Sequence, residues 1–140
     1  MKPNRVLTLI FLLLITVFVF GCFNQTESPH QILSDIGAQS AFELIQHNQG
    51  NETFVIIDVR TLEEFNEGHI ENAINIDFYS EAFKEDLDKL DKDKIYFIYC
   101  RSGNRSGRAM PIMKELGFKE VYHLSVGIQE WRAEGWPIIK

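Results

Sequence analysis

The stretch Ile95-Tyr-Phe-Ile-Tyr-Cys-Arg-Ser-Gly-Asn-Arg-Ser-Gly107 sets the architecture expected for this chain. Its first five residues are apolar or aromatic, and they predict a buried strand. Apolar residues then recur at spacings near three and four from Ala109 to Leu116, which predicts a helix. The segment therefore has the form strand, glycine-containing loop, helix.

Cys100 lies between that strand and the start of that helix. Backbone N–H groups at a helix N-terminus bind anions and lower the pKa of a thiol. Arg101, Arg105 and Arg108 add positive charge, and no acidic residue lies among them. A structural cysteine would have apolar neighbours on both sides, whereas Cys100 is followed by polar and charged residues. The pattern predicts a reactive thiolate in a loop that receives anions.

Strand and helix patterns alternate along the rest of the chain. This alternation predicts an α/β fold with a mostly parallel central sheet and helices on both faces. Ligands bind such sheets at the carboxyl ends of the strands, where Cys100 is placed. Trp136–Lys140 is expected to pair at a sheet edge, and Pro111 lies inside a predicted helix. The other predicted elements are strands at 54–59, 73–76 and 121–124, helices at 40–47 and 80–90, and short helices beginning at Thr61 and Gly127.

Residues 1–22 have the layout of an export signal. Lys2 and Arg5 precede an apolar run from Val6 to Phe20, which is shorter than the roughly 20 residues of a membrane-spanning helix. The run ends at Cys22 and resembles a bacterial lipoprotein signal; an uncleaved anchor is the alternative. We therefore expect a signal peptide at 1–21, lipidation of Cys22, a flexible tether at 22–34 and one domain at 35–140. The protein would be exported and anchored to a membrane, facing the periplasm or the cell exterior.

Charge and cysteine content narrow the function further. The net charge is −6, and without residues 1–21 it becomes −8, from 12 basic and 20 acidic residues. An acidic domain with no polybasic stretch is not expected to bind nucleic acid. If Cys22 carries lipid, Cys100 has no disulfide partner in an exported setting. We expect no cofactor and no metal site, because the four histidines are scattered: His30, His47, His69 and His123.

Two segments carry a resemblance to a known family: Asp58–Ile76, which contains Asp-Val-Arg and Gly-His-Ile, and the loop Cys100–Ser106. With Gly127–Trp131 and Trp136-Pro137, they resemble the single-domain rhodaneses, the thiosulfate sulfurtransferase family. The resemblance implies that Cys100 attacks the sulfane sulfur of thiosulfate and forms a persulfide. A thiophilic acceptor, a thiol or cyanide, would then remove that sulfur.

The resemblance also implies roles for the residues around Cys100. The backbone N–H groups of residues 101–106 would surround the sulfur, and Gly103 would permit the tight turn. No general base is obvious beside Cys100 in the sequence. From its position at the end of a strand, Asp58 is expected to fix a neighbouring loop or cap a helix, and Arg60 is expected to support the site either by pairing with an acidic group or by lining the pocket. Substrate contacts are expected from the loop side chains Arg101, Ser102, Asn104, Arg105 and Ser106, with Arg101 and Arg105 holding the sulfonate oxygens.

Two other classes of function are alternatives. A small cysteine-dependent phosphatase or arsenate reductase also places cysteine and arginine around an anion, but its loop is one residue longer than the spacing from Cys100 to Arg105. A non-enzymatic persulfide carrier or binding module is the second alternative. It would share the loop without turning over thiosulfate.

Overall fold

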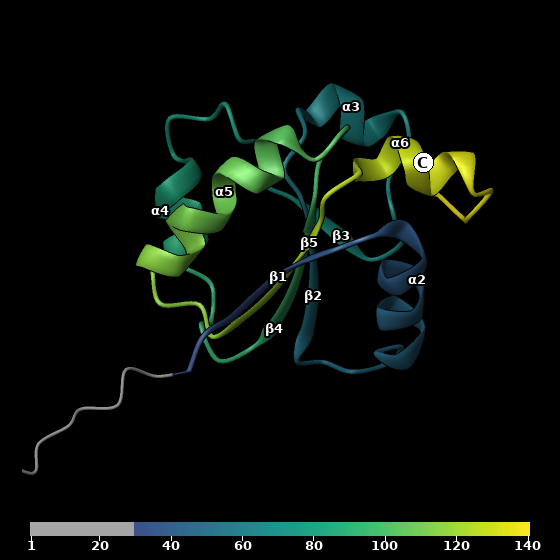
Figure 1. Cartoon of the computed structure of the whole chain (residues 1–140). Helices are drawn as coiled ribbons and strands as arrows, with labels where there is room; N and C mark the ends of the chain where they lie inside the picture. The colour runs from purple at the N-terminus through teal and green to yellow at the C-terminus, as the bar shows by residue number, and fades with distance from the viewer. Residues whose placement is uncertain (1–29) are drawn as a thin grey trace, which may run out of the picture.

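The computed structural model describes residues 30–140, which form one sheet with helices packed against it (Figure 1). The strands are β1 (Ile32–Ile36), β2 (Phe54–Asp58), β3 (Ala73–Asn75), β4 (Ile95–Tyr99) and β5 (Glu120–Leu124). The helices are α2 (Ala38–His47), α3 (Leu62–Asn66), α4 (Phe83–Asp88), α5 (Asn104–Glu115) and α6 (Gly127–Ala133).

The sheet has the strand order β1-β5-β4-β2-β3, and every pairing in it is parallel. All five carboxyl ends therefore lie at the same edge, with β4 in the centre. The predicted α/β fold with a mostly parallel sheet is confirmed. Because Cys100 follows β4 directly, it lies at the middle of that edge.

Both faces of the sheet are covered, as predicted. Figure 1 shows α4 and α5 on one side of the strands and α2 and α6 on the other. Alternate β4 side chains point to opposite faces. Tyr96 and Ile98 belong to the apolar cluster under α4 and α5, whereas Phe97 and Tyr99 belong to the one under α2 and α6. Burial on both faces explains why the strand sequence is continuously apolar.

The predicted boundary between the tether and the domain is wrong. Residues up to Ser34 were expected to form the flexible tether, but Ile32–Ile36 is the edge strand β1, paired with β5. Ser34 and Asp35 interrupt the apolar pattern, so the strand has no clear sequence signal. Its backbone hydrogen bonds come from a partner strand almost ninety residues away.

Two further segments differ from expectation. Helix α4 begins at Phe83 rather than Ser80, because the side chains of Asp77 and Ser80 accept backbone hydrogen bonds in turns that replace its first residues. The C-terminal segment forms a single antiparallel bridge between Ile139 and His69 instead of pairing at the sheet edge.

The predicted signal peptide, the lipidation site Cys22 and most of the predicted tether lie outside the described residues. Within residues 30–140, no helix is both long and apolar enough to cross a membrane.

Candidate active site

Cys100 lies at the base of a loop that runs from the end of β4 into α5. Gly103 makes the turn with a left-handed φ of 88°, and a Cβ there would overlap the carbonyl oxygen of Ser125. Only glycine fits this position, because other residues rarely adopt that φ and no space exists for a side chain. The loop is thus pressed against the turn that follows β5.

The first turn of helix α6 is hydrogen-bonded to the same loop. The N–H groups of Ile128 and Gln129 donate to the carbonyl oxygens of Cys100 (2.9 Å) and Arg101 (3.1 Å). Gly127 permits this approach, since a Cβ there would overlap the Arg101 carbonyl. These contacts leave the N–H groups of the loop free to face the sulfur.

The Cys100 thiol is buried and surrounded by hydrogen-bond donors. Burial raises the pKa of the thiol. Hydrogen bonds from the Ser106 hydroxyl and from the N–H groups of Ser106, Ser102 and Gly103 lower it, and on balance the pKa lies below its ordinary value. The Ser106 Oγ lies 3.3 Å from Cys100 Sγ. Of the N–H groups of residues 101–106 that were expected around the sulfur, those of Ser102, Gly103 and Ser106 are hydrogen-bonded to it.

Arg105 is engaged within the protein. Its Nη1 and Nη2 atoms donate to the carboxylate of Glu64 at 2.6 and 2.8 Å, and its side chain is largely buried. The hydrogen bonds to Arg105 are the main cause that lowers the pKa of Glu64 to about 2. Arg105 was expected to hold a substrate anion, but here its charge is matched by Glu64. No local pattern indicates this pairing, because Glu64 lies 41 residues away, in the predicted short helix that begins at Thr61.

Glu64 is itself held in place by α3. The side chain of Thr61 accepts from the Glu64 N–H, and the Glu64 carboxylate accepts from the Thr61 N–H, which forms a capping box. The predicted helix start at Thr61 is confirmed. This box fixes the carboxylate that holds Arg105.

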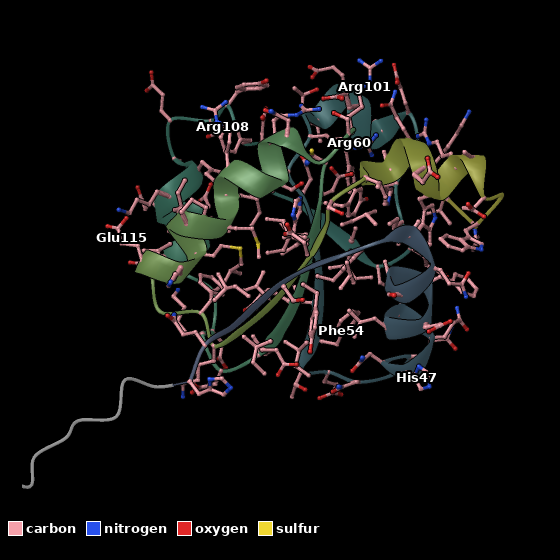
Figure 2. All side chains as sticks on the ribbon, in the orientation of Figure 1. His47, Phe54, Arg60, Arg101, Arg108 and Glu115 are labelled. Atoms are coloured by element: carbon pink, nitrogen blue, oxygen red, sulfur yellow. The ribbon has the colours of Figure 1, made fainter. Side chains whose placement is uncertain are left out.

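Arg101 faces a polar cavity beside the loop. The cavity has a volume of about 350 Å³. Among the described residues, no side chain forms an ion pair with Arg101. Figure 2 shows Arg60 and Arg101 at the same end of the molecule, with His47 and Phe54 at the other. Seven residues line the cavity: Arg60, Glu64, Glu67, Arg101, Ile128, Gln129 and Arg132.

Asp58 and Arg60 form a buried ion pair at the end of β2. Arg60 donates from Nε and Nη2 to both carboxylate oxygens of Asp58, at 2.6–3.0 Å, and from Nη2 to the carbonyl of Gly68 at 2.8 Å. The pair thereby ties the strand end to the loop after α3. This geometry agrees with the supporting role expected for Asp58, and Arg60 both pairs with that carboxylate and lines the polar cavity.

The remaining predicted loop residues, Ser102 and Asn104, are exposed, and two other candidate side chains pack against aromatic rings. Ser102 supplies its backbone N–H to the thiol, while Asn104 opens α5. Arg108 lies over the ring of Phe78, and His69 stacks on Phe65. Within residues 30–140, no three His, Cys, Asp or Glu side chains are grouped to hold a metal ion.

The structure also brings a histidine to the site that sequence reasoning left out. His123, on β5, lies with Nε2 at 2.9 Å from Ser106 Oγ and with Nδ1 at 2.8 Å from Asp35 Oδ1. No base is obvious beside Cys100 in the sequence, and the structure places this imidazole behind the Ser106 hydroxyl that contacts the thiol. The only available signal was that His123 comes close to the carboxyl end of a predicted strand.

The fold and the site together define a class: α/β proteins with a cysteine at the carboxyl end of a central parallel strand, inside a loop whose N–H groups face the sulfur. The model of the rhodanese-like domain matches residues 40–134. The chain belongs to the rhodanese-like family.

Similar proteins agree with this assignment. A tRNA uridine(34) hydroxylase of Photorhabdus laumondii is 33% identical over 128 residues, covering 84% of this chain and 35% of that protein. The chain thus spans about a third of the length of the curated relatives it matches. A rhodanese-related protein of Thermoplasma volcanium has a TM-score of 0.64 at 33% identity, covering 75% of this chain and 96% of that one. A rhodanese-like domain protein of Staphylococcus aureus has a TM-score of 0.61 at 28% identity, covering 76% and 99%.

Proposed function

We propose that this protein is a sulfurtransferase that moves sulfane sulfur from thiosulfate, or a similar anionic donor, to a thiophilic acceptor. The observation that carries the proposal is the position of the Cys100 sulfur, which faces three backbone N–H groups and the Ser106 hydroxyl. These donors stabilise negative charge on sulfur, in the thiolate and in a persulfide alike.

In the first step, the Cys100 thiolate attacks the outer sulfur of thiosulfate. A new S–S bond forms, the S–S bond of thiosulfate breaks, and sulfite leaves with that bonding pair. The enzyme then carries a persulfide whose terminal sulfur lies among the same donors. No external oxidant or reductant is needed, because the sulfane sulfur keeps its oxidation state when it moves from thiosulfate to Cys100.

In the second step, an acceptor nucleophile attacks the terminal sulfur of the persulfide. Cyanide yields thiocyanate and a thiolate yields an acceptor persulfide, while Cys100 leaves as a thiolate. The same loop that activates the nucleophile also stabilises it as a leaving group. The reaction therefore follows ping-pong kinetics.

The polar cavity supports an anionic donor. Arg101 lines it without an ionic partner among the described residues, so its guanidinium is available for the sulfonate oxygens. The whole protein is acidic, which disfavours general anion binding outside this loop. The tRNA-directed activity in the name of the curated relatives belongs to proteins of which the match covers only about a third, and the acidic charge of this chain does not favour an RNA substrate.

The test compares the full-length protein with a Cys100→Ser variant. We expect the unmodified protein to release sulfite from thiosulfate and to gain the mass of one sulfur atom on the peptide that contains Cys100. The variant should do neither. A sulfur adduct without turnover to cyanide or small thiols would indicate a persulfide carrier, and hydrolysis of a phosphate ester without sulfite release would overturn the proposal in favour of a phosphatase.

We also propose that the protein is exported and anchored through lipid on Cys22. The basic start, the apolar run to Phe20 and the cysteine that follows support this location. Labelling with a fatty-acid analogue should place lipid on the wild-type chain, and Cys22→Ser should lose both the label and the membrane association. Retention of the variant in the membrane would favour an uncleaved anchor.

A further inference from the structure

His123 lies behind the cysteine loop, with each ring nitrogen facing a different element. Nδ1 lies 2.8 Å from the carboxylate of Asp35 on β1. Nε2 lies 2.9 Å from Ser106 Oγ and 3.1 Å from the carbonyl oxygen of Gly103. Ser106 Oγ in turn lies 3.3 Å from Cys100 Sγ. A continuous chain of hydrogen bonds thus joins Asp35 to the thiol.

The donors and acceptors along this chain allow two arrangements of the hydrogens. A carboxylate only accepts, so Nδ1 of His123 carries a hydrogen toward Asp35. When Nε2 has no hydrogen, it accepts from the Ser106 hydroxyl, and the thiol keeps its own proton. When Nε2 is protonated, it donates to Ser106 Oγ and to the Gly103 carbonyl, and the hydroxyl hydrogen points at the Cys100 thiolate.

We propose that His123, oriented by Asp35, takes up the proton of the Cys100 thiol through the Ser106 hydroxyl. The S–H bond breaks as a new O–H bond forms at Ser106, while the original Ser106 hydrogen moves to Nε2. The products are a Cys100 thiolate and a His123 imidazolium, so atoms and charge balance. His123 and Asp35 are positioning residues in this scheme, which rests on the proposed sulfurtransferase function.

The same hydrogen bonds also provide a route by which the thiol proton can reach solvent. The Cys100 residue is 1% exposed and the His123 side chain 6%, whereas the Asp35 side chain is 71% exposed. A proton released at the buried sulfur can therefore reach water at the surface of β1. Asp35 lies outside residues 40–134, which match the family model, so the family match does not account for this contact.

The imidazole ring of His123 is closely packed by its neighbours. Gly107 packs against it, and a Cβ at that position would lie 3.3 Å from Cε1 of His123. The titratable groups in the hydrogen-bond network of the ring are Asp35 on β1 and, through Ser106 on α5, Cys100 after β4. The imidazole thus lies between a surface carboxylate and the reactive thiol.

The test measures the rate at which iodoacetamide alkylates Cys100 as a function of pH, in the full-length chain carrying Cys22→Ser so that Cys100 is the only thiol. His123→Gln keeps a hydrogen-bonding group but takes up no proton. We expect it to slow alkylation near neutral pH about tenfold, because the imidazolium that supports the thiolate through Ser106 can no longer form, and to move the pH profile upward. Asp35→Asn, at an exposed site that tolerates the change, should shift the profile in the same direction by a smaller factor.

His47→Gln is the matched control, because His47 is exposed on α2 at the opposite end of the molecule (Figure 2). It should leave the profile unchanged. Wild-type alkylation profiles in both His123→Gln and Asp35→Asn would overturn the relay. Alkylation does not depend on thiosulfate, so shifted profiles in a protein that releases no sulfite would support the relay and reject the proposed function.

Discussion

Both carboxylate oxygens of Glu64 accept hydrogen bonds from the guanidinium of Arg105. Glu64 belongs to α3, and Arg105 belongs to α5, the helix that follows the cysteine loop. The carboxylate is fixed by the capping box at Thr61, and the arginine lies two residues into α5, where the loop ends. The pair therefore sets the position of the helix start whose N–H groups face the Cys100 sulfur. It also leaves Arg101 as the arginine of the loop without an ionic partner among the described residues.

Replacing Glu64 with Gln should remove part of the acid sensitivity of the fold. The pKa of Glu64 is about 2 in the folded protein, below its ordinary value of 4.5. A depressed carboxyl pKa stabilises the folded state above about pH 4.5, and this stabilisation is lost as the pH falls toward 2. Urea unfolding from pH 7 to pH 2 should show a smaller loss of stability in Glu64→Gln. An identical pH dependence would mean that the ion pair contributes nothing to folding.

Replacing Ser106 with Ala should raise the apparent pKa of Cys100. The hydroxyl helps to hold that pKa below its ordinary value, so its loss moves the reactivity profile to higher pH. Sulfite release near neutral pH should fall about tenfold, because one hydrogen bond to a charged sulfur is lost. Ser102→Ala is the matched control, since Ser102 contributes its backbone N–H, which alanine keeps. Equal effects from both variants would argue against a specific role for the Ser106 hydroxyl.

Replacing Arg101 with Ala should weaken binding of the anionic donor. Its guanidinium lines the polar cavity beside the loop, whereas Arg108 lies over Phe78. We expect KM for thiosulfate to rise about tenfold in Arg101→Ala, as for the loss of a charge-assisted contact, with kcat less affected. Steady-state kinetics with Arg108→Ala as the comparison should show KM close to wild type. A rise of KM in both variants would indicate general electrostatics instead of a specific contact.

Replacing Gly103 with Ala should disrupt the loop and the fold around it. The left-handed φ is unfavourable for alanine, and the new Cβ would overlap the backbone of Ser125. Gly50→Ala is the control, because Gly50 has a similar φ of 77° but open space around it. Thermal unfolding should show a small loss for Gly50→Ala, of about 1 kcal/mol, and a much larger one for Gly103→Ala. Equal losses would mean that backbone strain, not the contact with Ser125, dominates.

Local sequence patterns were sufficient to predict most of the helices and strands. The apolar runs that form β2 and β4 are continuous because both faces of these strands are buried, and Thr61 marks the start of α3 through a capping box. The strand β1 had no such signal, because Ser34 and Asp35 lie between its apolar residues. Its place in the sheet depends on pairing with β5, which a local pattern does not report.

The sequence by itself determined the strand, loop and helix around Cys100, since strand burial, the glycine turn and the helix start depend on neighbouring residues. Tertiary structure alone decided the partners of that loop. Glu64 and Arg105 are 41 residues apart, and Asp35 and His123 are 88 apart. Such pairs meet only because parallel strands bring their carboxyl ends to one edge of the sheet. The sequence therefore pointed to Cys100 as the candidate nucleophile, but not to the groups that surround it in the fold.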